Sequence, residues 1–252
     1  MKALQAIVAV GLACASLAAQ AIGQRADVAI FDRATSRELP VYWHEGRAYV
    51  VGRPGAEYEV RVRSQRSEDL LAVVSVDGLN VMNGQAASPK QSGYVITSWQ
   101  SVEIKGWRKS MEDVASFYFT QLANSYAGRT GRPENVGVIG VALFERKRHY
   151  TVPAEVAPYP ERMESNRDSS ANESRAKTLQ APAAAAPLGT GHGRREESRV
   201  YWAQFERSTD APVETIAIYY DSYRNLVAQG VLPAPTARRD PNPWPTSFTP
   251  DP

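Results

Sequence analysis

The string Gly189-Thr190-Gly191-His192-Gly193-Arg194-Arg195 is the part of this chain whose residue types and spacing most suggest chemistry. Glycines at alternate positions can bring backbone amides around an anion, and the histidine and arginines would add positive charge. A phosphate-binding loop, however, follows a strand and opens a helix. Here the string follows a proline-rich stretch and leads into an expected strand. We therefore interpret it as a flexible return of the chain into a sheet, and keep His192 and Arg194 as candidate binding residues.

Tryptophans are the other candidates for a binding surface. Exposed aromatic rings can stack on sugars or anchor a protein partner, although most tryptophans lie in a core. The four that precede the C-terminal tail are Trp43, Trp99, Trp107 and Trp202. Gly106-Trp107-Arg108-Lys109 resembles a loop with a cationic rim. We therefore expect Trp107 and Arg108 to be exposed and to take part in binding.

The sequence lacks the motifs by which common hydrolases and nucleotide-binding enzymes are recognised. It contains no Gly-x-Ser-x-Gly elbow, no His-Glu-x-x-His pair and no Gly-x-x-x-x-Gly-Lys-Ser/Thr loop. A metal site would need carboxylates besides the three histidines, and the neighbours His44 and Glu45 would point to opposite faces of a strand, although a turn would relax this. We expect no metal site and no cofactor. A pair of carboxylates acting on a glycan leaves no sequence signature, so that alternative stays open.

The N-terminal residues 1–21 are typical of a secretory signal peptide. Met1-Lys2 is a short positive region, residues 3–19 are almost wholly apolar or small, and Ala19-Gln20-Ala21 has the small-x-small pattern of a cleavage site. An uncleaved anchor would need about 20 strongly apolar residues. We expect cleavage after Ala21 and a periplasmic or secreted protein.

The composition of the mature chain excludes several classes of site. The single cysteine, Cys14, lies in the predicted leader, so the mature chain has no disulfide, thiolate zinc site or iron–sulfur cluster. Lipidation at Cys14 is a minor alternative, because Leu12 stands one place too late for a lipoprotein leader. Without Lys2, 28 basic residues face 27 acidic ones. This balance implies no nucleic-acid partner.

Composition also divides the mature chain. We predict a first folded part at 26–150, a disordered linker at 151–189, a second folded part of the same domain at 190–232, and a disordered tail at 233–252. The linker combines prolines and alanines with a polar centre that buries too little apolar surface to fold. The proline content of the tail favours an extended, polyproline-type conformation. The alternative is a solvated chain end without a function. Its seven prolines are Pro233, Pro235, Pro241, Pro243, Pro245, Pro250 and Pro252.

Short strand signals separated by turn residues indicate a mainly β protein, an antiparallel β-sandwich with one or two short helices. Tyr58, Val60 and Val62 alternate with charged residues, and Asp77-Gly78 and Asn83-Gly84 are typical of tight turns. Other strands are expected at 70–76, 94–97, 101–105, 136–144, 199–206 and 213–220. The last two should pair with the first folded part.

Two helices are predicted, one of them in an ambiguous segment. Residues 110–128 combine apolar residues at helical spacing with the strand-favouring Phe117-Tyr118-Phe119. We favour a strand near 114–120 followed by a short helix. A second short helix should begin at a cap of Asp221 or Ser222 and end at Gly230.

Several segments together carry a resemblance to other proteins. They are Val74-Ser75-Val76-Asp77-Gly78-Leu79-Asn80-Val81, Gly106-Trp107-Arg108-Lys109-Ser110, residues 129–141, Leu188-Gly189-Thr190-Gly191-His192-Gly193 and Tyr219-Tyr220-Asp221-Ser222-Tyr223. This set resembles a group of uncharacterised exported proteins of Gram-negative bacteria. The resemblance implies an extracytoplasmic setting and brings no activity.

These observations favour a non-enzymatic binding module of the bacterial cell envelope, with a protein or another envelope component as its partner. One alternative is a carbohydrate-binding module or a carboxylate-based glycan hydrolase. Another is an assembly subunit that uses a sheet edge. The sequence leaves the oligomeric state open.

Overall fold

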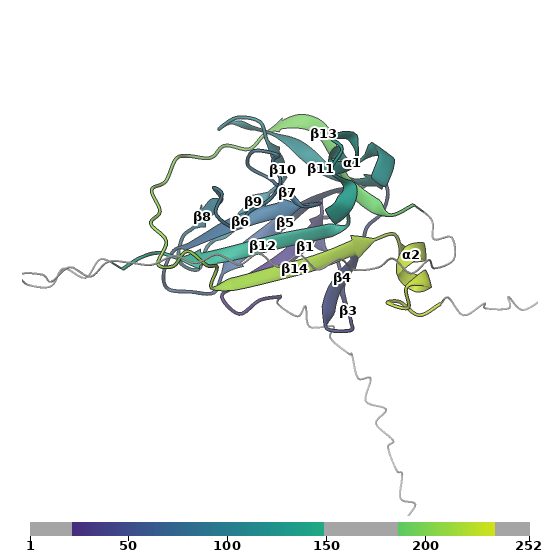
Figure 1. The fold of residues 1–252 in the computed structure, drawn as a ribbon, viewed down its shortest axis with the longest axis horizontal. Helices are drawn as coiled ribbons and strands as arrows, with labels where there is room; N and C mark the ends of the chain where they lie inside the picture. The colour runs from purple at the N-terminus through teal and green to yellow at the C-terminus, as the bar shows by residue number, and fades with distance from the viewer. Residues whose placement is uncertain (1–21, 149–185, 235–252) are drawn as a thin grey trace, which may run out of the picture.

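The computed structural model describes residues 22–148 and 186–234 (Figure 1). The predicted leader, the linker up to residue 185 and the tail from residue 235 lie outside the described residues. Within them the chain forms two packed β-sheets with a few short helices, so the prediction of a mainly β fold is confirmed. None of the described helices is long and apolar enough to span a membrane.

The first sheet runs in the order β10-β11-β5-β1-β2, and β13 and β9 pair with β11 and β5 respectively. Its strands are β1 (Ala26–Asp32), β2 (Arg37–Glu38), β5 (Glu57–Ser64), β9 (Ser101–Ile104), β10 (Gly106–Arg108), β11 (Asp113–Gln121) and β13 (Leu188–Glu197). All of their pairings are antiparallel.

The second sheet runs in the order β3-β4-β14-β12-β6-β7, and β8 pairs with β6. Its strands are β3 (Val41–His44), β4 (Arg47–Val51), β6 (Leu70–Val76), β7 (Leu79–Asn80), β8 (Tyr94–Ile96), β12 (Val138–Glu145) and β14 (Glu214–Asp221). One pair departs from the predicted antiparallel arrangement, because β14 lies parallel to β4.

The hydrophobic pattern of each strand matches the faces that it buries. In β5, Tyr58, Val60 and Val62 are buried in the main core between the sheets. In β6, a continuous apolar run, Val74 faces that core while Val73 belongs to a second, smaller cluster. The second cluster comprises Leu71, Val73, Ala142 and Phe144, with Val95 and Phe205 packed against it. A strand covered on both faces is therefore apolar throughout.

The helices are short and begin at serine caps. After β11 the chain forms the 3₁₀ turn η1 (Leu122–Asn124) and α1 (Tyr126–Arg129), where the Ser125 hydroxyl accepts from the amide of Gly128 at 3.0 Å. A second 3₁₀ turn, η2, spans Pro133–Asn135. The last helix, α2 (Tyr223–Ala228), has Ser222 as its cap. The ambiguous segment is thus a strand followed by a short helix.

The glycine string forms a strand, contrary to the prediction of a flexible return. β13 begins at Leu188, two residues before the predicted start of the second folded part, and residues 199–206, expected as a strand, have no regular structure. Packing explains the correction. A Cβ at Gly191 would lie 2.1 Å from the ring of Tyr118, its cross-strand partner, and one at Gly189 would lie 2.6 Å from Cβ of Ser125. The glycines let β13 pass beneath side chains that would otherwise clash.

Both segments that flank residues 149–185 contribute to the two sheets. β13 pairs with β11 in the first sheet, and β14 lies between β12 and β4 in the second. The shared core therefore holds residues from both sides of that gap in the description.

A buried polar cluster joins the two sheets. The carboxylate of Asp77, in the β6–β7 turn, accepts from the amide of Thr190 at 2.7 Å, from the amide of Gly137 at 3.0 Å and from the hydroxyl of Tyr220. The Thr190 hydroxyl lies 2.6 Å from each of the hydroxyls of Tyr58 and Tyr220. Asp77 is fully buried and has a left-handed backbone with φ 53°, as an Asp-Gly turn requires.

Burial raises the pKa of Asp77 from 3.8 to about 6, although its three donors favour the ionised form. The pKa of Asp77 is higher in the folded protein than in the unfolded chain. Between pH 3.8 and about 6, the folded protein therefore binds the proton more tightly than the unfolded chain does. The contribution of Asp77 to stability is therefore complete below about pH 4 and is lost as the pH rises through about 6.

Asp77→Asn is expected to destabilise the fold at pH 7 by about 1–3 kcal/mol, because the amide group would place a donor against one of the three donors. The wild-type free energy of unfolding should fall relative to that of D77N, by up to about 3 kcal/mol, as the pH rises from 4 to 7. Urea unfolding of both proteins across this range measures the difference. A constant difference would show that Asp77 does not titrate in this way.

Candidate functional site

The candidate site lies beside the segment that follows β13 and leads toward β14. We call residues 198–207 of this segment the arch. In Figure 1 it is the light-green trace that curves around the end of the molecule where β8 lies. Its first residues are fixed to the β10–β11 turn, since the amides of Ser198 and Val200 donate to the carbonyls of Glu112 and Met111 at 2.6 and 2.8 Å. The arch therefore starts from a defined position.

Its last residues are fixed to the end of β12. The amide of Lys147 donates to the carbonyl of Glu206 at 2.8 Å, and the amide of Ser208 donates to that of Glu145 at 2.9 Å. These two hydrogen bonds form an isolated antiparallel β-bridge in which Arg207 lies opposite Arg146. The arch is thus held by backbone hydrogen bonds at both ends.

Two arginines reinforce these anchors. Arg108 donates to the carbonyl of Ser198 and, at 3.0 Å, to the hydroxyl of Tyr94. Arg207 donates to the carbonyls of Pro89 and Gln91 at 2.8 and 2.6 Å. Its guanidinium carbon lies 4.0 Å from the ring centre of Phe144. A planar cation with several donors is suited to such combined stacking and bridging.

The middle of the arch has no such anchors. Tyr201 and Trp202 are 86% and 85% exposed, among the most exposed large hydrophobic side chains of the described chain. Within the described residues, the backbone amides and carbonyls from Tyr201 to Ala203 form no hydrogen bond with another backbone group. The arch therefore presents two aromatic rings and a stretch of unpaired backbone.

A groove of about 950 Å³ lies between the arch and the sheets. Most of its apolar lining comes from Leu71, Met82, Tyr94, Val95, Val102, Met111, Val200, Tyr201, Trp202, Ala203 and Phe205. Its polar lining comes from Asn83, Lys90, Gln91, Ser92, Arg207 and Asp210. A concave, largely apolar surface with a few polar groups is the usual form of a ligand site.

The groove also lies over the ends of both sheets. Val95 belongs to β8, which pairs only with β6, and Val102 belongs to β9, which pairs only with β5. Among the described strands, each therefore has one unpaired edge. An unpaired edge is a template for another extended chain unless something covers it, and here the arch faces β8 and β9 across the groove.

The charged groups of the groove are few and do not form a catalytic set. No described residue makes an ion pair with Lys90 or Asp210, and Asp210 is the only carboxylate in the lining. Hydrolysis by paired carboxylates needs two such groups about 5–9 Å apart.

Trp107, predicted to be an exposed binding residue, is buried. Its side chain is 3% exposed, and its indole N–H donates to the carbonyl of Gly191 at 3.3 Å. The ring packs edge-on against Phe117, with centroids 5.3 Å apart, and against Tyr126 at 4.9 Å. The predicted loop is strand β10, and its pairing with β11 turns this side chain into the core.

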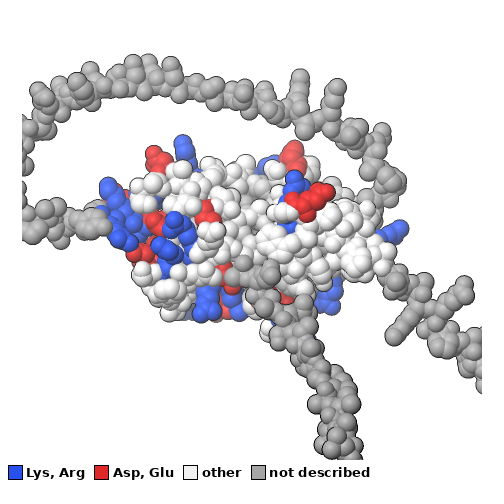
Figure 2. Space-filling model, turned by 90° about the horizontal axis from the view of Figure 1, so that it is seen from below, with Lys and Arg blue, Asp and Glu red and all other residues white. Residues whose placement is uncertain are grey.

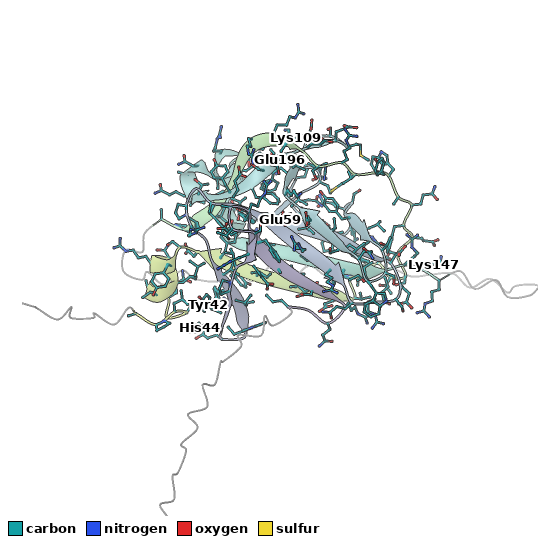
Figure 3. All side chains as sticks on the ribbon, turned by 180° about the vertical axis from the view of Figure 1, so that it is seen from behind. Tyr42, His44, Glu59, Lys109, Lys147 and Glu196 are labelled. Carbon is teal, nitrogen blue, oxygen red and sulfur yellow. The ribbon has the colours of Figure 1, made fainter. Side chains whose placement is uncertain are left out.

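The other predicted site residues lie on the first sheet and outside the groove. Arg108 anchors the arch, as described above. His192, in β13, is half-buried with its ring 5.5 Å from that of Tyr126, and burial lowers its pKa. Figure 3 places its strand neighbour Glu196 near Lys109. The structure does not bring these residues together with Trp107 into a common site.

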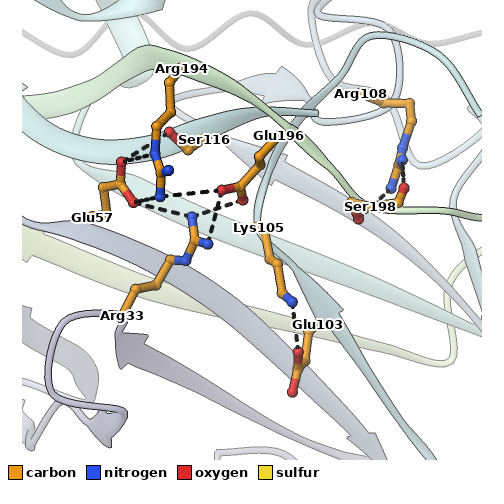
Figure 4. A network of polar contacts seen from close by, with 9 residues as sticks. All are labelled: Arg33, Glu57, Glu103, Lys105, Arg108, Ser116, Arg194, Glu196 and Ser198. Atoms are coloured by element: carbon orange, nitrogen blue, oxygen red, sulfur yellow. Dashed lines mark hydrogen bonds and ion pairs between the residues drawn. The ribbon is translucent and has the colours of Figure 1, made fainter. Parts of the chain in front are cut away.

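Arg194 is occupied in an ionic network on the outer face of the first sheet (Figure 4). It donates two hydrogen bonds to the carboxylate of Glu57, at 3.0 and 3.1 Å, while Arg33 contacts both Glu57 and Glu196. The hydrogen bonds from Arg194 hold the pKa of Glu57 below its ordinary value. This network connects β13 to β5.

Other candidate sites are weaker than the groove. His44 Nε2 lies 3.9 Å from a Glu45 oxygen at the tip of the β3–β4 hairpin, and Figure 3 shows His44 and Tyr42 far from Glu196. Among residues 22–148 and 186–234, no group of three or more His, Cys, Asp or Glu side chains is placed to hold a metal ion.

Figure 2 shows lysine and arginine side chains gathered at one end of the molecule, with acidic side chains among them. Ion pairs connect Arg25 with Glu145, Arg146 with Asp69, Lys147 with Glu206 and Arg148 with Glu68. The charges of these residues are therefore largely paired with one another.

The sequence does not reveal the groove, because the residue pattern of 199–206 predicts a strand and the structure has none there. Trp202 was identifiable only as one of four tryptophans, and nothing in its neighbours separates an exposed ring from a buried one. Lys90 and Phe205 carried no signal at all. Comparison with protein-family models, with curated proteins and with solved structures found no match to this chain.

Arg207→Lys is expected to loosen the arch, because one ammonium group cannot bridge two carbonyls and stack on Phe144. Amide hydrogen exchange at Lys147 and Ser208, whose amides donate across the bridge, should accelerate about tenfold, which corresponds to about 1.4 kcal/mol. Arg199→Lys is the matched control, since that exposed side chain contacts only Glu197 among the described residues. Equal exchange in the two variants would contradict the anchoring role.

Proposed function

We propose that this protein is a non-enzymatic binding module of the bacterial cell envelope, and that its groove holds an extended, proline-rich polypeptide segment. The observation that carries the proposal is the exposed aromatic pair of the arch, Tyr201 and Trp202, beside unpaired backbone and over a large apolar groove. Large exposed apolar surfaces of this kind mark interaction sites.

The location in the envelope rests on the sequence. Residues 1–21 have the pattern of a secretory leader, and the rest of the chain contains no cysteine. The resemblance to exported proteins points to the same compartment.

A polypeptide fits the groove because the groove offers unpaired backbone. Free amides and carbonyls of residues 201–203 and the open edges of β8 and β9 can all pair with an extended chain. Main-chain hydrogen bonds then provide affinity, and the side-chain pockets provide selectivity. A small compact ligand would leave most of these groups unused.

A proline-rich segment fits better than an ordinary strand. Aromatic rings form the surfaces on which polyproline-type helices pack, and such helices lose little entropy on binding because they are already extended. Proline also offers a carbonyl acceptor without an amide donor. The side chains at the groove that can donate to such carbonyls include the indole of Trp202, the hydroxyl of Tyr201 and the ammonium of Lys90.

Binding without turnover is supported by the chemistry of the lining. Asp210 is its single carboxylate, and none of the lining residues is a histidine, cysteine or serine hydrogen-bonded to a base. A general acid–base pair or an activated nucleophile needs such partners within hydrogen-bond distance.

Trp202→Ala is expected to weaken binding of proline-rich peptides at least tenfold, as the loss of a central aromatic contact does at interfaces. The test screens the full chain against arrays of proline-rich peptides, proline-free strand-forming peptides and oligosaccharides, and then measures Kd by calorimetry. Trp43→Ala is the matched control, because Trp43 is 52% exposed but lies on β3, outside the groove.

Three outcomes would contradict the proposal. The first is binding of oligosaccharides alone, which would assign the aromatic pair to sugar stacking. The second is release of cleaved product from any ligand on the arrays. The third is an equal loss of affinity in Trp43→Ala and Trp202→Ala.

A further inference from the structure

We infer that the polypeptide segment bound in the groove carries an acidic side chain, Asp or Glu, and that Lys90 pairs with its carboxylate. This inference rests on the proposed function, because it names a chemical feature of the ligand at the same site. It makes Lys90 the residue that selects among proline-rich segments.

The lining of the groove has a surplus of positive charge. It holds two cations, Lys90 and Arg207, and one carboxylate, Asp210. Burial lowers the pKa of Arg207, and the negative charge of Asp210 acts in the opposite direction. The single carboxylate of the lining thus offsets the charge of Arg207, and the charge of Lys90 is left over.

The side chain of Lys90 has no partner among the described residues. Its one hydrogen bond within them uses the backbone amide, which donates to the hydroxyl of Ser88 at 3.4 Å. Two other lysines, Lys105 and Lys147, do form ion pairs, with Glu103 and Glu206 respectively. A carboxylate that enters the groove therefore meets an ammonium group that gives up no contact with those residues.

The backbone on both sides of Lys90 is held in place. Arg207 donates to the carbonyls of Pro89 and Gln91 at 2.8 and 2.6 Å. The side-chain oxygen of Gln91 accepts from the amide of Ser88 at 2.8 Å, and the amide of Gln91 donates to the carbonyl of Ser88 at 3.1 Å. Binding of a carboxylate then has to order only the lysine side chain, which keeps the entropic cost small.

A carboxylate suits this position better than a backbone carbonyl of the ligand does. Hydrogen bonds between two ionised groups are about twice as strong as those between neutral groups. Much of the remaining lining is apolar, and an ion pair at a partly dry surface is screened less than one in open water. The acidic side chain thus adds affinity to the packing of prolines on Tyr201 and Trp202.

The experiment uses the chain from Ile22 to Pro252 and short proline-rich peptides with acetylated and amidated ends. Three matched sets carry Glu, Gln or Lys at one varied position. Because the ends are blocked, a side chain supplies the only carboxylate that differs between the sets. The best glutamate peptides should bind about fivefold more tightly than their glutamine counterparts, which is the upper range for an exposed ion pair. Calorimetry measures each Kd.

Lys90→Ala identifies the partner of that carboxylate. It should lower the affinity for the glutamate peptides to that for the glutamine peptides, and leave the latter unchanged. Lys109→Ala is the matched control, since Lys109 is exposed and has no ion pair among the described residues, but lies outside the groove. Lys90→Glu should reverse the preference, so that the lysine peptides bind more tightly than the glutamate peptides. An equal loss in the two alanine variants would assign the preference to overall charge and overturn the inference.

Asp210→Asn tests the charge balance of the lining. Without this carboxylate the charge of Arg207 is no longer offset, so the glutamate peptides should bind about twofold more tightly than they bind the wild type. Weaker binding of the glutamate peptides to D210N would contradict the assigned charge balance and overturn the inference.

The outcomes separate this inference from the proposed function. If the glutamate and glutamine peptides bind equally, and Trp202→Ala weakens both, the inference falls while the groove remains a site for proline-rich segments. If no peptide of any set binds, both ideas fall. A preference for glutamate that persists unchanged in about 0.5 M salt would rule out pairing with an exposed ammonium group, and would also overturn the inference.

Discussion

The buried carboxylate of Asp77 is the contact on which the rest of this structure depends. It accepts hydrogen bonds from Thr190, Gly137 and Tyr220, which belong to β13, to the start of β12 and to β14. These elements come from both sheets and from both sides of residues 149–185. An ionised group in a dry core is costly unless its lone pairs are satisfied, so the positions of its donors are narrowly defined. The carboxylate thus determines how the sheets meet.

Fixing Thr190 also fixes β13, and β13 determines where the arch begins. Glycines at 189 and 191 allow this strand to pass beneath Ser125 and Tyr118, so the strand is defined by packing and not by its own hydrophobicity. From its end the arch crosses open space to the bridge at Arg207. Backbone hydrogen bonds hold both ends of the arch, and residues 201–203 in its middle form none with another backbone group. Binding residues of proteins often lie on such irregular segments, which a rigid scaffold holds in place.

The groove and the arch lie beside strand edges of this sandwich that have no pairing partner among the described strands. β8 and β9 leave two unpaired edges at the same end of the molecule. Such edges invite aggregation unless they are covered, and the arch faces them across the groove. The space that remains is large enough for a further segment of chain. Under the proposed function, the element that faces the edges would also contact the ligand.

Much of the fold was determined by the sequence alone. Alternation in β5, the continuous apolar run of β6, the Asp77-Gly78 turn and the serine cap of α2 are local signals, and each depends on residues a few positions apart. The sequence also predicted strands on both sides of residues 149–185. Its fold class followed from these signals, because alternating short strands with tight turns can bury their apolar faces only in packed sheets.

The candidate site was decided by the tertiary structure. Trp107 stands beside charged residues and Trp202 stands in an apolar run, yet pairing of β10 with β11 buries the first, and the absence of any pairing partner among the described strands exposes the second. The glycine string became a strand because Tyr118 lies over it, and the apolar run 200–203 failed to become one because no described strand lies beside it. Burial depends on which distant segments meet, and no local pattern of residues carries that information.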